Sequence, residues 1–295
     1  MSAPQGLSDA DLPGLFHGAD AASMEGQQRH VRAMQLRLTF AIVAAATGVA
    51  TFRVGAAGID LLSIGTVIAL VIVVAVEFYL KSVRPEDTWY DGRALAESAK
   101  SLSWRYAVGA APFTKQLSDA RADYVDGLKM LLHDAPPTSI RPTSAPAVTD
   151  GMQALRDSAL EVRREAYLAD RISDQRTWYA GKAERNEILS YRWGIMLLTI
   201  ETLGILAALS RAVGLVNFDL AGVVAAFIGA GAAWLAVRQY STNARAYTYA
   251  AHELSIVYQR LHTIEDEDAW AAEVADAEEA ISREHTMWRA SRSRS

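Results

Sequence analysis

The sequence predicts an all-α membrane protein with four transmembrane helices, arranged as two hairpins, and a cytoplasmic helical bundle. Three observations lead to this fold class. Four apolar stretches, at 38–52, 61–76, 193–210 and 218–237, contain almost no charged residue. The segments between them are rich in Arg, Glu and Asp, although the whole chain is 51% hydrophobic and 21% charged. Lys and Arg also gather at one end of each stretch.

Each apolar stretch is expected to cross the bilayer as a helix of roughly 20 residues. The predicted spans cover about 38–57, 61–80, 193–210 and 217–237. The first stretch is short, so we expect its helix to continue through "VGAAG" to residue 57, with Arg53 reaching the headgroups. The alternative is a soluble bundle of buried helices, which normally keep a polar stripe that "VIALVIVVAV" at 67–76 lacks.

The distribution of basic residues predicts the orientation of the spans in the membrane. The two short hairpin loops hold one Arg each, Arg53 and Arg211. The other ends of the spans are flanked by Arg29, Arg32, Arg37, Lys81, Arg84, Arg93, Lys100, Arg176, Lys182, Arg185, Arg192, Arg238 and Arg245. By the positive-inside rule, both termini and the long middle segment are cytoplasmic.

The chain is expected to contain two units, 1–133 and 151–295, each a two-span hairpin followed by cytoplasmic helix. The Pro-rich stretch 134–150 is the predicted linker between them and cannot form a continuous helix. After it, an apolar seam at helical spacing predicts an amphipathic helix that runs toward the third span. Its residues are Met152, Leu155, Ala159, Val162, Ala166 and Ala169.

Two further seams follow the fourth span and predict an antiparallel pair of helices, packed on each other or on a neighbouring subunit. The first comprises Tyr247, Ala250, Leu254, Val257, Leu261 and Ile264. The second follows "EDED" at 265–268, whose acidic residues suit a helix N-terminus, and comprises Trp270, Val274, Ala277, Ile281 and Trp288.

Composition argues against several classes of function. The chain has no Cys, which excludes disulfides and thiolate chemistry, and its net charge of −5 gives no reason to expect nucleic-acid binding. The six His residues do not form a zinc-binding pair, so we expect no metal, no cofactor and no enzyme. The polar first 28 residues do not resemble a cleaved signal peptide.

Small residues in the fourth predicted span are candidates for close helix packing. "GAGAA" at 229–233 superficially resembles a phosphate loop, but it lies inside a span with no preceding strand. Two small-xxx-small rows explain it better, and they present a surface either to another span or to another subunit. The rows are Gly222, Ala226, Ala230 and Ala225, Gly229, Ala233.

Glu201 stands near the middle of the third apolar stretch, where an ionised carboxylate costs about 2.5–3.5 kcal/mol. Three interpretations remain open. Glu201 is protonated or bonded to Thr199, Thr202 or a neighbouring helix and holds the bundle together. Alternatively, copies of Glu201 from several subunits line an ion path that favours cations. The third interpretation is proton-linked transport. Against it, the chain has only four predicted spans and lacks the pair of broken helices that such transporters use. Glu77, at the end of the second span, needs only an ion pair with Lys81.

Several segments resemble the SLATT family, the SMODS- and SLOG-associating two-transmembrane effector domains of bacterial conflict systems. "WYDGRALAESAKSLSWRYAVGAAPF" at 89–113 is similar to the stretch after the hairpin, and 11–30 is similar to the lead-in of one subtype. "YLADRISDQRTWYAGKAERNEILSYRW" at 167–193 and "EEAISREHTMWRA" at 278–290 are similar to the entry and exit of a second. The order of these segments suggests a tandem of two units.

The resemblance implies an inner-membrane effector that forms a pore or perturbs the membrane when an associated sensor protein or nucleotide second messenger triggers it. It implies no catalytic residue. The residues that match the family segments are candidates for signal or partner contact, or for helix packing. They are Trp89, Arg93, Glu97, Lys100, Trp104, Gln175, Trp178, Lys182, Asn186, Glu279, Glu284 and Trp288.

The sequence therefore predicts a homo-oligomeric inner-membrane effector with an ion-conducting path near Glu201. One alternative is a non-conducting membrane scaffold that assembles partners on its cytoplasmic helices. Another is a small ion channel or transporter unrelated to defence. A membrane enzyme requires a convergent polar cluster at the interface.

Overall fold

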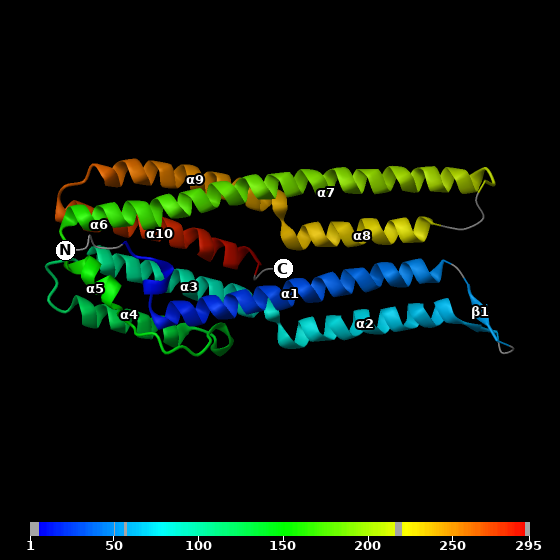
Figure 1. The fold of residues 1–295 in the computed structure, drawn as a ribbon, viewed down its shortest axis with the longest axis horizontal. Coiled ribbons are helices and arrows are strands. Elements are labelled where there is room, and N and C mark those ends of the chain that lie inside the picture. The colour runs from blue at the N-terminus through cyan, green and yellow to red at the C-terminus, as the bar shows by residue number, and fades with distance from the viewer. Residues whose placement is uncertain (1–5, 50, 56–57, 216–219, 293–295) are drawn as a thin grey trace. The chain divides into compact units, whose positions relative to one another are not determined.

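The computed structural model describes residues 6–49, 51–55, 58–215 and 220–292, of which 138 and 282–292 are described without their side chains. This part of the chain is almost entirely helical, with one two-stranded ladder (Figure 1). The elements in chain order are η1 Asp9–Asp11, α1 Gly14–Gly48, β1 Arg53–Val54, β2 Ile59–Asp60, α2 Leu61–Val83, α3 Pro85–Val108, α4 Ala120–Asp134, η2 Pro137–Ser139, α5 Asp150–Asp157, α6 Leu160–Ala166, the π-helix η3 Tyr167–Ser173, α7 Asp174–Ala212, α8 Ala221–Arg238, α9 Tyr240–His262 and α10 Glu267–Arg292.

Three helical stretches of the described chain are long and apolar enough to span a membrane. They are Leu61–Val108, Leu160–Ala212 and Ala221–His262, each of which joins an apolar segment to a polar one. Within the chain, only 11%, 0% and 6% of the residues in the most apolar part of each stretch are buried. The structure therefore shows an all-α protein with three candidate membrane spans.

The chain divides into two compact units that interleave along the sequence. We call residues 28–84 and 181–247 the apolar unit because they contain the candidate spans. We call residues 1–27, 85–180 and 248–295 the polar unit. Helices α1, α7 and α9 each contribute residues to both units.

In the apolar unit, α2 runs antiparallel beside the second half of α1 (Figure 1). The hydroxyls of Thr47 and Thr66 are 2.8 Å apart near the turn, and Arg37 and Glu77 form an ion pair of 3.1 Å at the other end. Lys81 lies 3.4 Å from the same carboxylate, which confirms the predicted Glu77–Lys81 pair.

The second hairpin of the apolar unit is formed by α7 and α8, which pack closely through glycines. A Cβ at Gly231 would lie 2.5 Å from Leu197 Cδ2, and one at Gly204 would lie 2.6 Å from Val224 Cγ1. Trp193 and Trp234 meet near the far end of the hairpin, with their ring centroids 6.4 Å apart. The two helices are therefore antiparallel, as α1 and α2 are.

The expectation that the first span continues to residue 57 is wrong, because α1 ends at Gly48. Residues 53–54 instead pair with 59–60 as a short β-ladder. Gly55 and Gly58 have φ of +78° and +63°, a conformation that glycine adopts readily and that a helix does not contain. The Asp60 carboxylate accepts hydrogen bonds from the Phe52 and Leu62 amides and so caps α2.

The second helix of each hairpin ends in the same way, at a residue in the left-handed conformation. Arg84, after α2, has φ 47° and ψ 54°, and Gln239, after α8, has φ 48° and ψ 41°. Each donates its amide to the carbonyl four residues earlier, Leu80 and Leu235 respectively. In each case a long helix of 24 or 23 residues follows, α3 or α9. The two halves of the chain thus repeat a local structure as well as a hydropathy pattern.

Helix α3 is the centre of the polar unit and contacts α4, α5, α6, η2 and α10. Its small residues Ala99, Ala107 and Val108 and its large residues Trp104 and Tyr106 are buried. On α9 and α10, the predicted seam residues Ala250, Leu254, Leu261, Trp270, Val274, Ala277 and Ile281 are buried as well. Trp288 of this seam lies outside the residues whose side chains the structure describes.

The helix predicted after residue 151 is interrupted. Met152 and Leu155 are buried in α5, but Ser158 and Ala159 are extended and restart the chain as α6 in a new register. A π-helix, Tyr167–Ser173, then turns Tyr167, Leu168, Arg171 and Ile172 inward. The predicted seam residues Ala159 and Ala169 are exposed, so that part of the prediction is wrong.

The Pro-rich stretch forms only the 3₁₀ turn η2 between α4 and α5 and lies against the start of α1. The Gly14 amide donates to the Pro146 carbonyl at 3.0 Å, and the Arg141 amide donates to the Gly18 carbonyl at 2.9 Å. The Arg141 side chain also forms an ion pair of 2.5 Å with Glu25. This stretch therefore belongs to the packed polar unit.

Candidate functional site

The candidate site in the polar unit begins where α1 and α3 cross. A Cβ at Gly26 would lie 2.6 Å from the Trp89 amide nitrogen, and a Cβ at Gly92 would lie 2.9 Å from the Ala19 carbonyl oxygen and the Ser23 amide nitrogen. Since both contacts are with backbone, only glycine permits this approach. The crossing brings the backbone of α1 directly against that of α3.

Beside the crossing lies a cavity of about 240 Å³, which we call the α1–α3–α7 cavity. Helix α1 contributes Phe16, Asp20, Ser23, Met24 and Gln27; α3 contributes Trp89, Arg93, Ala96, Glu97 and Lys100; α7 contributes Asp174, Gln175 and Trp178; and η1 contributes Asp9. The walls are thus partly aromatic and partly charged.

Basic groups in this cavity are held by aromatic rings and carboxylates. The Arg93 guanidinium lies 5.9 Å from the centroid of the Trp178 ring, and Lys100 Nζ lies 5.7 Å from that of Phe16. Lys100 Nζ also forms an ion pair of 2.5 Å with Asp9. Trp89 stacks on Tyr90 with a centroid separation of 4.7 Å, which fixes the orientation of its indole.

The pKa of the Asp20 carboxyl depends on its burial and on the other charges of the cavity. Partial burial and the nearby charges of Asp9 and Glu97 raise the pKa of the Asp20 carboxyl, against the opposing effect of Lys100 and Arg93. Repulsion among carboxylates and loss of solvent therefore outweigh the attraction of the two bases.

In the same unit, a buried charge network joins the π-helix to α10 and α3. Arg171 forms a bidentate pair with Glu278, in which Nε and Nη2 donate to the two carboxylate oxygens at 2.9 and 2.8 Å. Tyr167 and Ser101 donate their hydroxyls to the same carboxylate at 2.8 and 2.6 Å. The Arg171 and Glu278 side chains are 1% and 0% exposed, so this pair is fully withdrawn from water.

The network controls how its members ionise. Burial alone lowers the pKa of the Arg171 guanidinium, but the charge and hydrogen bonds of Glu278 reverse this effect and raise it. Burial and the Glu278 charge raise the pKa of the Tyr167 phenol. Arg171 therefore stays ionised and Tyr167 stays neutral at physiological pH.

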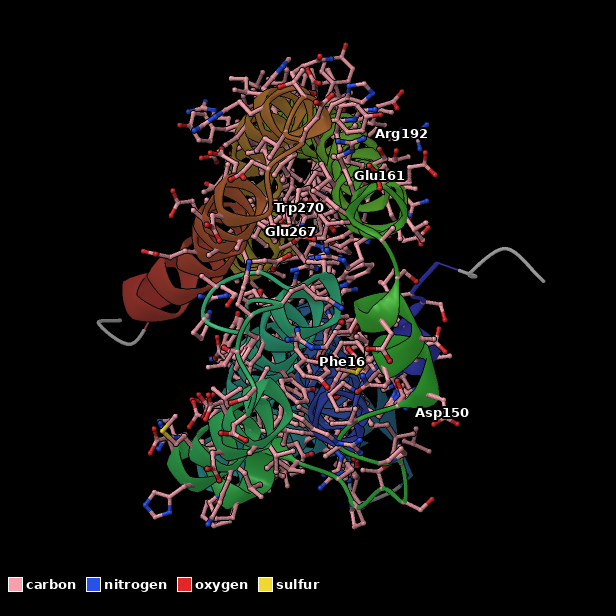
Figure 2. All side chains as sticks on the ribbon, turned by 90° about the vertical axis from the view of Figure 1, so that its left-hand side faces the viewer. Phe16, Asp150, Glu161, Arg192, Glu267 and Trp270 are labelled. Atoms are coloured by element: carbon pink, nitrogen blue, oxygen red, sulfur yellow. The ribbon has the colours of Figure 1, made fainter. Side chains whose placement is uncertain are left out.

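A second buried arginine ties the start of α10 to the end of α3. Arg163 Nη1 donates to the Val108 carbonyl at 2.5 Å, and its Nη2 pairs with Glu267. Trp270 Nε1 donates to the same Val108 carbonyl at 2.9 Å. Figure 2 labels Glu267 and Trp270 together on α10.

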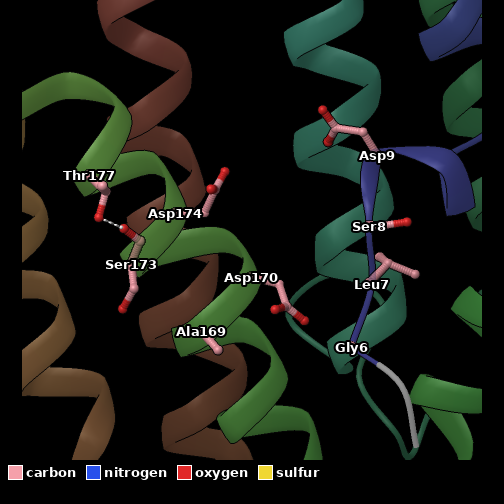
Figure 3. A pocket seen from close by; sticks show the side chains of 9 residues that line it. All are labelled: Gly6, Leu7, Ser8, Asp9, Ala169, Asp170, Ser173, Asp174 and Thr177. Atoms are coloured by element: carbon pink, nitrogen blue, oxygen red, sulfur yellow. Dashed lines mark hydrogen bonds between the residues drawn. The ribbon is translucent and has the colours of Figure 1, made fainter. Parts of the chain in front are cut away.

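A larger and more open pocket, of about 640 Å³, lies between residues 6–9 and the π-helix region (Figure 3). Asp170 points toward Gly6 and Leu7, with Asp9 and Asp174 above it in the view. Burial raises the pKa of the Asp170 carboxyl, although the Leu7 amide donates to it. This pocket shares Asp9 and Asp174 with the α1–α3–α7 cavity but has no aromatic wall.

In the apolar unit, Glu201 lies on α7 with its side chain exposed on the surface of the hairpin. The hydroxyls of Thr199 and Thr202 donate to the carbonyls of Ile195 and Leu198, each at 2.8 Å. Both hydroxyls therefore donate to their own helix rather than to Glu201.

The small-residue rows on α8 are largely left open by the chain itself. Apart from α8 itself, no heavy atom of the described residues lies within 4 Å of a Cβ built at Gly222 or Gly229, and Ala225 is exposed. Ala226, Ala230 and Ala233 are half-buried. The contact with α7 instead uses Gly231, which the sequence rows did not include.

Six of the predicted signal or partner residues line the α1–α3–α7 cavity: Trp89, Arg93, Glu97, Lys100, Gln175 and Trp178. Trp104 is buried against Tyr167, and Asn186 donates its amide to the Lys182 carbonyl on α7. Glu279 is exposed and lines a groove between α9 and α10. Glu284 and Trp288 lie outside the residues whose side chains the structure describes.

Sequence reasoning missed Asp20 and the buried Arg156, Arg163, Arg171 and Glu278. The three arginines recur at spacings of seven and eight residues, and this helical periodicity was an available signal.

These features define a class: an all-α membrane protein whose long helical stretches contain candidate spans and also contribute residues to a polar helical unit. The comparison with family models identifies the family. Residues 13–164 match SMODS and SLOG-associating 2TM effector domain 3, and residues 167–288 match SMODS and SLOG-associating 2TM effector domain 1. The chain belongs to this SLATT family and contains two of its domains in tandem.

SLATT domains are membrane effector domains of conflict systems and are generally not catalytic. The two matched regions meet between residues 164 and 167, where α6 passes into the π-helix. Comparisons with curated proteins and with solved structures give no match.

Proposed function

We propose that the chain is a bacterial inner-membrane effector in which the polar unit receives a signal and the apolar unit opens an oligomeric ion path. Both hairpins cross the membrane, giving four spans, with the polar unit and both termini in the cytoplasm. Basic residues at the polar ends of the hairpins support this orientation. Each half, before and after the Pro-rich stretch 134–150, supplies one two-span hairpin.

One observation carries the proposal: α7 is a single helix of 39 residues that contains parts of both sites. Its first residues, Asp174, Gln175 and Trp178, line the α1–α3–α7 cavity. Glu201 lies seven turns further along the same helix. A change in the cavity that shifts the start of α7 is therefore transmitted to Glu201 without an intervening loop.

Homo-oligomerisation completes the ion path, because one chain supplies a single mid-span carboxylate. The open positions Gly222, Ala225 and Gly229 on α8 support close approach of a helix from another copy. A ring of Glu201 side chains around a water-filled path favours cations over anions.

Ion flux from liposomes that contain the purified full chain tests this function. We expect wild-type protein to release cations and Glu201→Gln to lose flux or cation preference. Glu187→Gln is the matched control, since it removes a carboxylate from an exposed position of α7 outside the apolar run. Equal flux from all three proteins would show that Glu201 does not line the ion path, which favours its packing role. Absence of flux from wild type, including after co-expression with neighbouring-operon proteins, favours a membrane scaffold.

A further inference from the structure

The α1–α3–α7 cavity has the chemistry of a ligand site, and the charge of its wall indicates which ligand. Four carboxylates, Asp9, Asp20, Glu97 and Asp174, face two bases, Arg93 and Lys100, so the lining carries a net charge of −2. The charges of the buried pair Arg171 and Glu278 cancel each other. The cavity is therefore acidic as a whole, even though Arg93 and Lys100 point into it.

Two indoles and a phenyl ring complete the wall: Trp89, Trp178 and Phe16. Aromatic faces attract cations through their quadrupole, and carboxylates attract them through charge. Within this cavity, both basic side chains already use the rings in this way, at 5.9 and 5.7 Å. A volume of about 240 Å³ suits a compact molecule, since pockets that bind drug-sized ligands measure roughly 300–1,000 Å³.

We infer that the α1–α3–α7 cavity binds a small aliphatic cation that carries an ammonium or guanidinium group. Its charged group lies between the Asp20 and Glu97 carboxylates, and its aliphatic part lies along the indoles of Trp89 and Trp178. The same wall disfavours a nucleotide, because phosphate groups would meet four carboxylates. This inference rests on the cavity alone and stands whether or not the apolar unit conducts ions.

Calorimetric titration of the detergent-solubilised full chain with agmatine, which carries both cationic groups, is the direct test. We expect saturable binding that weakens about tenfold in Asp20→Asn, where a charge-assisted contact is lost. Trp178→Leu is expected to weaken it several-fold, because the indole surface that covers the aliphatic part of the ligand is lost. Asp123→Asn, an exposed carboxylate on α4, is the matched control and keeps wild-type affinity. Circular dichroism of each variant verifies that it is folded.

The pH dependence of agmatine affinity provides an independent readout. Asp20 is faced by Asp9 from η1, by Arg93, Glu97 and Lys100 from α3, and the lining also includes Asp174 from α7. Its carboxyl has a raised pKa, and a bound cation favours the ionised form. Affinity in wild type therefore falls as the pH is lowered through that pKa, and the fall is smaller in Asp20→Asn.

Three results overturn the inference: no binding of agmatine, binding that Asp20→Asn and Trp178→Leu both leave unchanged, or adenosine monophosphate binding that Arg93→Gln abolishes. In the last case, the cavity takes an anion. None of these outcomes depends on ion flux, so they are distinct from failure of the proposed function.

Discussion

At the scale of single residues, the polar unit depends on a buried ion pair. Neither charge of this pair could be buried without the other. Arg171 and Glu278 are withdrawn from water, and Tyr167 and Ser101 satisfy the remaining carboxylate lone pairs. Such a pair gains little over two apolar side chains, but loss of one member leaves an uncompensated buried charge.

We therefore predict a large difference between single and double substitutions at this pair. Arg171→Met alone lowers the free energy of unfolding by about 3–5 kcal/mol, because Glu278 then has no cationic partner. Arg171→Met combined with Glu278→Leu recovers a large part of that loss. Thermal unfolding of the purified protein in detergent measures both. A double variant no more stable than the single one contradicts the prediction.

At the scale of elements, the position of the candidate cavity depends on how closely α1 and α3 cross. The contact is between backbones at Gly26 and Gly92, so neither helix can move aside by a rotamer change. Overpacking at such a contact costs typically 1–3 kcal/mol.

Gly92→Ala and Gly181→Ala should thus have effects of opposite sign. At Gly92, the added methyl group meets the Ala19 and Ser23 backbone and lowers the free energy of unfolding by about 1–3 kcal/mol. At Gly181, in α7, no described atom outside the helix itself lies within 4 Å of the added Cβ, and alanine stabilises the helix by about 0.5–1 kcal/mol. Chemical unfolding followed by circular dichroism compares them. If both variants are stabilised, the α1–α3 contact is looser than described.

The helical spacing of apolar residues predicted those helices in which this spacing continues without a break. The helices at 61–83 and 221–238 and the buried faces of α9 and α10 follow directly from the apolar pattern. The same reasoning failed where the chain changes period: at the Ser158–Ala159 break and at the π-helix that follows it. It also failed at the end of α1, where two glycines with positive φ outweigh the apolar run.

The candidate site was only partly predictable for a different reason. Family resemblance singled out Trp89, Arg93 and Trp178 from separate segments, but nothing in the sequence indicated that they share a cavity. Asp20 was missed because it lies in the polar first part of α1, before the first apolar stretch, and its place in the cavity emerges only from the crossing of α1 and α3. The role of Glu201 stays a prediction.

At the scale of the whole molecule, the proposed topology places the polar unit on one side of the membrane and the two short hairpin loops on the other. The chain has no Cys, so a single introduced Cys reports its side of the membrane without background labelling. Ser118 in the polar unit and Val213 after α7 are both exposed.

We predict that Val213→Cys reacts with a membrane-impermeant maleimide in spheroplasts, whereas Ser118→Cys reacts only after lysis. The physical reason is the excess of Arg and Lys at the polar ends of the hairpins, which holds those ends in the cytoplasm. Labelling is read by a mass shift on a gel. Reaction of Ser118→Cys in intact spheroplasts shows that the orientation is inverted.

The tandem arrangement has a consequence for stoichiometry. In the proposed topology, only the second hairpin carries a carboxylate near the middle of a span. Glu77 of the first hairpin lies toward the end of α2, where it pairs with Arg37 and Lys81. Fusion in one polypeptide fixes the ratio of these two unlike hairpins at one to one, whatever the level of expression. A proposed assembly of any number of copies therefore holds as many Glu201 side chains as chains, and half of its hairpins have no carboxylate within their apolar runs.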